Sequence, residues 1–272
     1  MNDVIDRVRE HYRATGLTDR LRTALTVFGP ESEKLNPKQL AALDHFHTRG
    51  LAATADLAKL AGINAESSVL DVGSGVGGPA RFLAATYGCG VTGVDLSEPF
   101  VEAARYLTER AGQSGQVSFQ PASALELPFD DGRFDIVLLQ HVAMNIADRS
   151  ALYREIRRVL KAGGKFATFD AVLNSGEPLY PVPWARTPAT SFLLTSAATL
   201  AAIEPAGFRT LISQDDTEVA KAWFTQLRAS GPPPSPNLGV VMGPDFAQLA
   251  ANLGRNVMEG RLGILTAVFE AV

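Results

Sequence analysis

A glycine-rich stretch is the first feature of this sequence that suggests chemistry. It reads VLDVGSGVGGPARFLA over residues 69–84 and lies between an apolar run and a stretch that favours a helix. Glycines let the backbone turn sharply and approach a ligand closely, and a proline such as Pro79 suits the first turn of a helix. In open parallel sheets, ligands bind at turns of this kind, at the carboxyl ends of the strands. Because a glycine-rich turn is weak evidence by itself, a turn that binds nothing is the alternative.

Two carboxylates narrow the choice of ligand. Asp95 ends the second predicted strand, 24 residues after Asp71, where an acidic side chain accepts hydrogen bonds from the ribose hydroxyls of a nucleotide. Asp71 precedes the first glycine of the loop by two residues. A carboxylate there would repel a pyrophosphate and attract a cation, which disfavours a nicotinamide dinucleotide. The two positions together predict an adenosine ligand that carries positive charge, such as S-adenosylmethionine.

The rest of the chain supplies the elements that must position these residues. Short β-branched runs alternate with helical patterns from Ser68 onward, which is typical of parallel βαβ units. Strands are predicted at residues 69–72, 91–95, 117–120, 134–139, 165–170, 208–213 and 263–269. Ser97 and Asp148 are suited to begin the helices after the second and fourth strands, and Gly112 and Gly163 to end them. The predicted fold class is α/β: a Rossmann-like, seven-stranded, mostly parallel sheet with helices on both faces.

Other segments are predicted to cover this core. Residues 1–50 form an N-terminal helical lid in this interpretation, and residues 51–272 form the core that binds the cofactor. Lid insertions are expected near residues 171–195, where four prolines interrupt the alternation, and near residues 217–259, before the last strand. The polar side of the final helix there, with Asn252 and Asn256, faces either solvent or the lid cavity.

Several spaced motifs resemble those of one family. LDVGSGVGGPARFLA is followed by VTGVDLS, by ALELPFDDGRFDIV and by REIRRVLKAGGKF. This series resembles the class I S-adenosylmethionine-dependent methyltransferases, closest to the sarcosine/dimethylglycine, ubiquinone/menaquinone and tocopherol methyltransferases. The likeness covers roughly residues 46–170. It implies S-adenosyl-L-methionine as cofactor, S-adenosyl-L-homocysteine as product, and an active site at the glycine loop.

The resemblance also implies roles for matching positions. The residues implied to bind the cofactor are Asp71, Gly73, Ser74, Gly75, Asp95, Leu96, Ser123, Ala124 and Gln140. The members from Asp71 to Gly75 would line the methionine end, Asp95 and Leu96 would hold the ribose and adenine, and Ser123 and Ala124 would lie beside the adenine. The family more often has an acidic residue in place of Ser123, so a backbone or water contact is expected there.

The methyl acceptor and the residues that bind it are less determined by the sequence. His141 follows the fourth strand and is the candidate general base, because its unperturbed pKa lies near neutrality; a histidine that only shapes the pocket is the alternative. Asn145 could orient a polar group of the acceptor, or cap a neighbouring loop. The aromatic residues Tyr12, Tyr180 and Trp184 could form walls that exclude water, or could simply pack.

Metal and disulfide chemistry are not expected. His45 and His47 lie two residues apart, but no acid-rich segment with ligand spacing accompanies them, so no metal site is predicted. Arg49, in the same segment, could lie near the methionine carboxylate or be an ordinary exposed arginine. Cys89 is the single cysteine, which excludes an internal disulfide.

The predicted function is methyl transfer to a small-molecule metabolite at N, O or C by in-line displacement. The alternative is a non-catalytic cofactor-binding partner or regulatory module. A net charge of −4 disfavours a nucleic-acid partner, no apolar run is long enough to suggest a membrane partner, and a cytoplasmic location is expected. A homo-oligomer is compatible with the sequence. Arg186 would suit a zwitterionic acceptor and apolar runs such as SFLLT a prenyl one, so both remain open.

Overall fold

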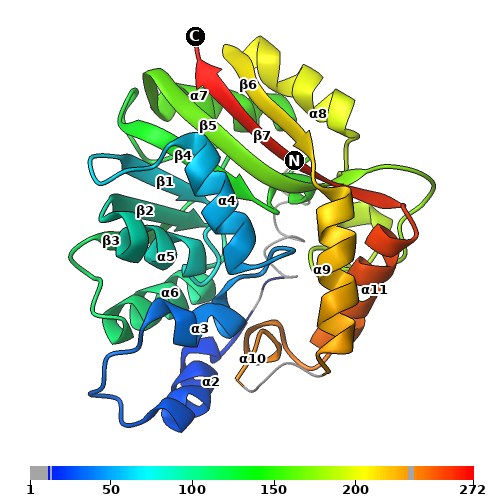
Figure 1. Ribbon diagram of the computed structural model, residues 1–272. Coiled ribbons are helices and arrows are strands. Elements are labelled where there is room, and N and C mark those ends of the chain that lie inside the picture. Colours follow the sequence, from blue (N-terminus) through cyan, green and yellow to red (C-terminus); the bar gives the residue numbers. More distant parts are fainter. Residues whose placement is uncertain (1–11, 13, 232–235) are drawn as a thin grey trace.

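The structure is a computed structural model that describes residue 12 and residues 14–231 and 236–272 (Figure 1). In this part of the chain seven strands form one sheet in the order β3-β2-β1-β4-β5-β7-β6. The strands are β1 (Ser68–Val72), β2 (Gly90–Asp95), β3 (Val117–Pro121), β4 (Phe134–Gln140), β5 (Leu160–Leu173), β6 (Phe208–Asp215) and β7 (Leu262–Ala271). The pairs from β3 to β5 are parallel, whereas β7 runs antiparallel between β5 and β6. The predicted Rossmann-like sheet is confirmed.

Helices cover both faces of the sheet. In order they are α2 (Leu17–Ala24), η1 (Leu25–Phe28), α3 (Pro37–Asp44), α4 (Leu51–Ala61), α5 (Gly78–Tyr87), α6 (Glu98–Arg110), η2 (Ala143–Asn145), α7 (Arg149–Val159), η3 (Pro188–Thr190), α8 (Ser196–Ile203), η4 (Glu204–Ala206), α9 (Thr217–Ala229), α10 (Gly239–Met242) and α11 (Phe246–Met258). One apolar core lies between the sheet and α4, α5, α9 and α11, and a second lies between the sheet and α7 and α8. No described helix is long and apolar enough to cross a bilayer.

The ends of α6 and α7 test the capping and terminating residues that the sequence predicts for these helices. Asp148 caps α7 as predicted, because its side chain accepts a hydrogen bond from Ala151 N at 2.9 Å. The predicted end of this helix at Gly163 is wrong: α7 ends at Val159, because Leu160 pairs with Phe134 and so begins β5. Ser97 occupies the N-cap position of α6 without a capping bond. Its hydroxyl instead donates to Tyr12 O at 3.1 Å.

The N-terminal helices and the segment before the last strand meet. A third apolar core joins Leu21 of α2, Leu40 of α3, Leu107 of α6 and Val241 of α10. Figure 1 shows α2 and α3 at one end of the molecule, with α10 between them and the α9–α11 pair. Two segments more than 190 residues apart in sequence are thereby brought to one side of the sheet.

Candidate active site

A cavity of about 240 Å³ opens at the carboxyl ends of β1, β2 and β4 and extends past β3. We call the lining residues at or just after these strand ends the floor: Val72, Gly73, Gly75, Val94, Asp95, Leu96, Ala122, Ser123, Ala124, Leu125, Gln140, His141 and Val142. We call the lining residues from the other segments the roof: Tyr12, Phe46, Phe100, Met144, Asn145, Ile146, Ala147, Asp148, Pro183, Trp184, Met242 and Leu253. Most residues predicted for the site are therefore brought together.

The glycine loop of the floor needs glycine for two reasons. Gly73 and Gly75 have φ angles of 73° and 54°, a conformation that side-chain-bearing residues rarely adopt. In addition, a Cβ on Gly73 would lie 2.3 Å from a methyl group of Val142, and one on Gly75 would lie 2.7 Å from the ring of Phe46. The loop is thus closely covered by side chains of the floor and the roof.

Asp95 fastens this loop and faces the cavity. Its carboxylate accepts hydrogen bonds from Gly75 N and Ser97 N, both at 2.9 Å. Burial raises the pKa of Asp95, and the hydrogen bonds from the backbone oppose that rise. Each carboxylate oxygen accepts one of these bonds and can accept another. Asp95 can therefore hold the loop and also receive hydroxyl groups of a ligand.

Asp71 is a buried carboxylate beneath the same loop. It is 2% exposed, and its Oδ2 has no hydrogen-bond partner among the described residues. Burial raises the pKa of Asp71 to about 7, and the charge of Asp95 adds to the rise. Asp71 and Ser74, whose buried hydroxyl also has no described partner, do not line the cavity itself. A cationic group reaching Asp71 would offset the cost of its buried charge.

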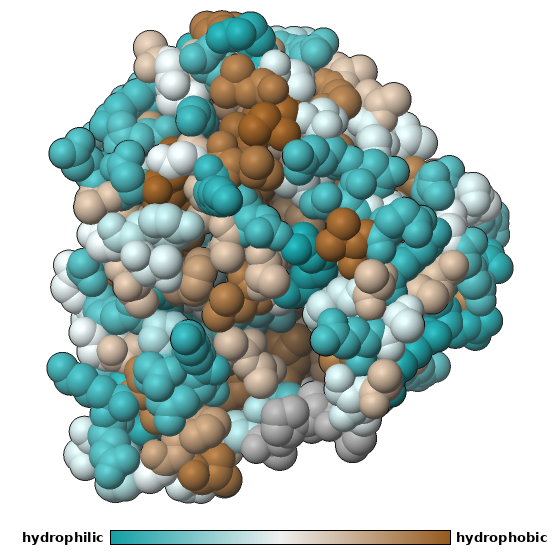
Figure 2. Space-filling view, in the orientation of Figure 1, coloured by the Kyte–Doolittle hydropathy of each residue, from teal (hydrophilic) through white to brown (hydrophobic). Residues whose placement is uncertain are grey.

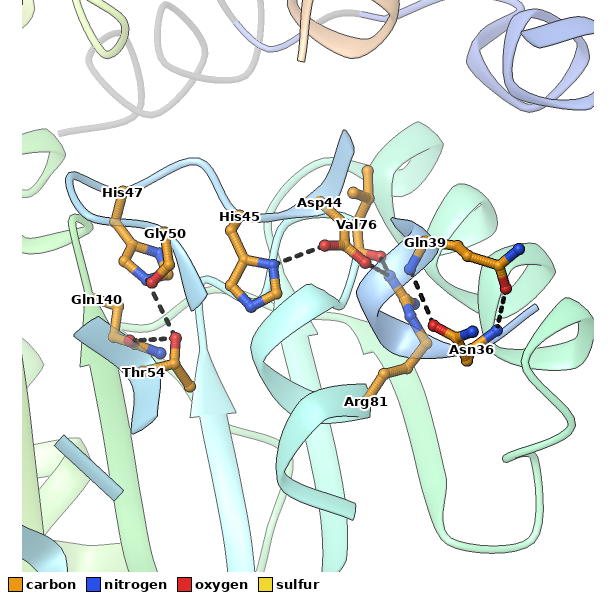
Figure 3. Close-up of polar contacts among 10 residues, drawn as sticks. All are labelled: Asn36, Gln39, Asp44, His45, His47, Gly50, Thr54, Val76, Arg81 and Gln140. Carbon is orange, nitrogen blue, oxygen red and sulfur yellow. Dashed lines mark hydrogen bonds and ion pairs between the residues drawn. The ribbon is translucent and has the colours of Figure 1, made fainter. Parts of the chain in front are cut away.

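Gln140 lines the cavity, and its side-chain amide is held by Thr54 of α4 (Figure 3). Thr54 Oγ1 donates to Gln140 Oε1 at 3.0 Å, and His47 Nε2 lies 3.1 Å from Thr54 Oγ1 and 3.0 Å from Gly50 O. Burial lowers the pKa of His47 well below its usual value, so its ring is neutral and its Nε2–H donates to Gly50 O. Gln140 Nε2 has no partner among the described residues.

His141 also lies on the floor, in a strained conformation. Its φ is 54°, its N–H donates to Phe169 O at 2.8 Å, and its ring stacks on Phe169 with centroids 5.3 Å apart. Burial lowers the pKa of His141 to about 3, so the ring is neutral at pH 7 and is a weak base. This environment favours the pocket-shaping role over the role of general base.

A buried ion pair holds the loop between α3 and α4. Arg81 is fully buried and donates to Asp44 Oδ2 at 2.8 Å and to Val76 O at 2.7 Å. Asp44 Oδ1 lies 2.6 Å from His45 Nδ1, so His45 is held within the same group (Figure 3). Among the described residues no three His, Cys, Asp or Glu side chains are grouped to hold a metal ion. Arg49 pairs with Asp56 at 2.5 Å instead of facing the cavity.

The comparisons with known proteins agree with this arrangement. Residues 70–168 match a family described as a methyltransferase domain. This segment of the chain is a methyltransferase domain. A sarcosine/dimethylglycine N-methyltransferase of Halorhodospira halochloris is 40% identical over 105 residues, 39% of this chain and 38% of the relative. A sterol 24-C-methyltransferase of Gibberella zeae is 39% identical over 118 residues, 43% of this chain and 31% of the relative.

One solved structure resembles nearly the whole chain. The geranyl diphosphate C-methyltransferase from Streptomyces coelicolor A3(2), in complex with S-adenosyl-L-homocysteine, has a TM-score of 0.71 and 18% identity. The likeness covers 99% of this chain and 98% of that one. The sequence matches, in contrast, span less than half of the length of either curated relative. The predicted resemblance to S-adenosylmethionine-dependent methyltransferases is confirmed for the domain.

The roof contains three of the four aromatic or amide residues proposed for the acceptor. Tyr12 OH donates to Asn145 Oδ1 at 3.3 Å, and Trp184 Nε1 donates to Ser191 Oγ at 3.0 Å. Tyr180 does not line the cavity and packs instead against the first apolar core.

Two asparagines of α11 position the segment that carries Trp184. Asn256 is fully buried, and its amide accepts from Leu179 N at 2.7 Å and donates to Leu179 O at 2.9 Å. Asn252 Nδ2 donates to Pro181 O at 2.9 Å. The expectation that their side of the helix faces solvent or the cavity is wrong for Asn256, since a proline-rich segment covers it. The pairing of two distant segments has no signal in the local sequence.

Proposed function

We propose that this chain transfers a methyl group from S-adenosylmethionine to a small molecule bound under the roof. The observation that carries the proposal is the place of the cavity: Gly73, Gly75 and Asp95 form its floor, inside the segment that matches a methyltransferase domain. Relatives that act on sarcosine, dimethylglycine or sterols support a small-molecule acceptor.

The unpaired groups of the site fit the cofactor. Asp71 supplies a buried carboxylate for a positively charged group, and Asp95 supplies acceptors for ribose hydroxyls. Leu96 and Ala124 offer apolar contact for the adenine, beside Ser123. Ser123 Oγ accepts a hydrogen bond from Leu125 N at 3.2 Å, which leaves its hydroxyl hydrogen for a ligand.

The chain's own residues would act mainly by orientation and by exclusion of water. S-adenosylmethionine supplies, when bound, an electrophilic methyl group on a sulfonium whose leaving group is a neutral thioether. The fixed amide of Gln140 would orient a hydrogen-bond acceptor at the strand end, and the roof would hold the nucleophile in line while excluding water. His141, neutral at pH 7, would accept a hydrogen bond rather than a proton.

Calorimetry with S-adenosylmethionine and S-adenosylhomocysteine tests this proposal. The Asp95→Ala variant should lose about 2 kcal/mol of binding free energy or more, because charge-assisted hydrogen bonds to the ribose are removed. The Asp130→Ala variant, changed at an exposed carboxylate, is the matched control and should bind like the parent. Absence of binding by the parent would overturn the proposal, and binding without turnover on any acceptor would favour the non-catalytic module.

A further inference from the structure

We propose that the methyl acceptor is a largely apolar molecule that carries no carboxylate or phosphate. This inference rests on the proposed function and names the class of substrate for the same site. It decides between the zwitterionic and the prenyl-like acceptors that the sequence left open. Three features of the cavity support it: the chemistry of its roof, the pairing of its polar groups, and the sign of its charges.

The roof presents mostly hydrocarbon and aromatic surface to the cavity. Its large side chains are Phe46, Phe100, Met144, Trp184, Met242 and Leu253. They come from several segments of the chain, spread between residues 46 and 253. Figure 2 shows hydrophobic side chains in the hollow between the part of the molecule that contains α2–α6 and the part that contains α9–α11. Burial against such a surface stabilises an apolar ligand.

The polar groups of the roof are engaged within the protein. Asn145 accepts from Tyr12 OH through Oδ1, and its Nδ2 donates to Val142 O at 3.3 Å. The indole N–H of Trp184 is bound to Ser191. Asp148 accepts from Ala151 N at the start of α7. An acceptor with many polar groups would have to break such bonds, whereas an apolar one leaves them intact.

The charged residues that line the cavity are carboxylates. Among the described residues they are Asp95 on the floor and Asp148 on the roof, and no lysine or arginine joins them. Arg186, the sequence's candidate clamp, lies outside the lining and pairs with Asp245 at 2.8 Å. Arg149 donates to Phe192 O at 2.9 Å and likewise does not line the cavity.

These charges act against an anionic acceptor. A carboxylate or diphosphate under the roof would lose water without gaining a cationic partner from the described lining residues, and it would be repelled by Asp95 and Asp148. The same carbon skeleton without the ionic group would avoid this cost and would keep its contacts with the apolar side chains of the roof. Of two ligands that differ only in such a group, the one without it should therefore bind more tightly.

Geraniol and geranyl diphosphate are a matched pair for the test, because they share a carbon skeleton and differ in charge. Trp184 and Trp223 are the two tryptophans of the chain. In a Trp223→Phe background, Trp184 is the sole tryptophan and reports directly on the roof. We would titrate the protein, loaded with S-adenosylhomocysteine, with geraniol, geranyl diphosphate and sarcosine, and follow tryptophan fluorescence.

We expect a saturable change with geraniol, at least tenfold weaker binding of geranyl diphosphate, and no change with sarcosine. Equal or tighter binding of geranyl diphosphate or sarcosine would overturn the inference, as would a lack of any saturable change with geraniol. A Met242→Lys variant should then gain at least fivefold in affinity for geranyl diphosphate, because it adds a cation to the roof at a half-buried position. Met258→Lys, at an exposed methionine that does not line the cavity, is the matched control and should gain nothing.

Failure of this inference is distinguishable from failure of the proposed function. Calorimetry with S-adenosylhomocysteine tests the floor without any acceptor, and the fluorescence titration can be repeated without the cofactor product. Binding of the product together with a preference for the anionic ligands would overturn the substrate class alone. Absence of product binding together with a preference for geraniol would overturn the proposed function and leave the selectivity of the roof established.

Discussion

The floor and the roof of the cavity are built in opposite ways. The floor comes from strand ends and the turns that follow them, and it holds a fixed loop, the carboxylate of Asp95 and the donor of Gln140, with Asp71 buried beneath. The roof comes from segments far apart in the chain, and its polar groups are paired within the protein. The difference separates two tasks: unpaired polar groups at the floor suit a charged cofactor, and the apolar roof suits the acceptor. Substitutions at the floor should therefore alter the pH dependence of stability and the binding of the cofactor. Substitutions at the roof should alter side-chain packing and the access of small molecules to Trp184.

The largest effect is expected for Asp71→Asn. The pKa of this carboxyl rises from 3.8 to about 7 on folding. At pH 8 the carboxylate is therefore charged in both states, but it is exposed to water in the unfolded state and buried in the folded state. The buried charge costs on the order of 4 kcal/mol. Below pH 7 the folded carboxyl takes up a proton, and the cost falls as the pH approaches 4. The variant should therefore be more stable than the parent at pH 8, and this advantage should shrink at pH 5.

Denaturant unfolding of the ligand-free protein at pH 8 and pH 5 measures this advantage. Asp130→Asn, at an exposed carboxylate, is the control and should unfold like the parent at each of the two pH values. If Asp71→Asn and the parent unfold alike at both pH values, Asp71 is not the buried charge described here. The same variant should bind S-adenosylmethionine more weakly. That result would show that the buried charge of Asp71, which destabilises the folded protein, contributes to binding of the cofactor.

A smaller effect is expected at the support of the roof. Asn256→Ala removes two hydrogen bonds and leaves the half-buried backbone of Leu179 unpaired, which should cost about 2–3 kcal/mol of unfolding free energy. The segment that carries Trp184 should loosen, so acrylamide should quench Trp184 more strongly in the Trp223→Phe background. Asn252→Ala, which removes a single bond to Pro181 O, should cost less. In both asparagine variants the affinity for S-adenosylhomocysteine should change less than threefold. A larger loss would argue against the division in which the floor binds the cofactor and the roof binds the acceptor.

A double-mutant cycle between Thr54 and Gln140 sharpens the description of the floor. Thr54→Val and Gln140→Leu each break the hydrogen bond between the two side chains. The coupling free energy of unfolding should be about 1 kcal/mol, as for a neutral hydrogen bond. Additive effects of the two substitutions would show that Thr54 does not orient the amide of Gln140.

The smallest effect is the absence of titration at His141. Since its pKa is about 3 in the folded protein, its ring should remain neutral from pH 8 down to pH 5 in an NMR titration, with the signal assigned by comparison with His141→Asn. The unfolded chain takes up this proton near pH 6.5, so this histidine should reduce stability as the pH falls below that value. A ring that titrates near pH 6.5 in the folded protein would restore the hypothesis of a general base.

The sequence by itself determined the floor. Short β-branched runs between helical patterns predict each strand, and the glycines and carboxylates follow the strands within a few residues. Their relative positions are therefore set by local backbone geometry. That is why Gly73, Gly75, Asp95 and Gln140 were predicted to meet and do meet at the cavity. The same local reasoning misplaced the end of α7, because the pairing of Leu160 with a strand 26 residues earlier competes with the helix.

Only the tertiary structure decided the roof and the supports behind both surfaces. Trp184 lies over the cavity because Asn252 and Asn256 hold the segment before it, and Gln140 is oriented because Thr54 comes from a helix 86 residues earlier. Burial likewise set the pKa of Asp71 and of His141, which composition and spacing do not encode. Contacts between distant segments depend on how the whole chain packs, whereas a strand and its turn are specified by neighbouring residues.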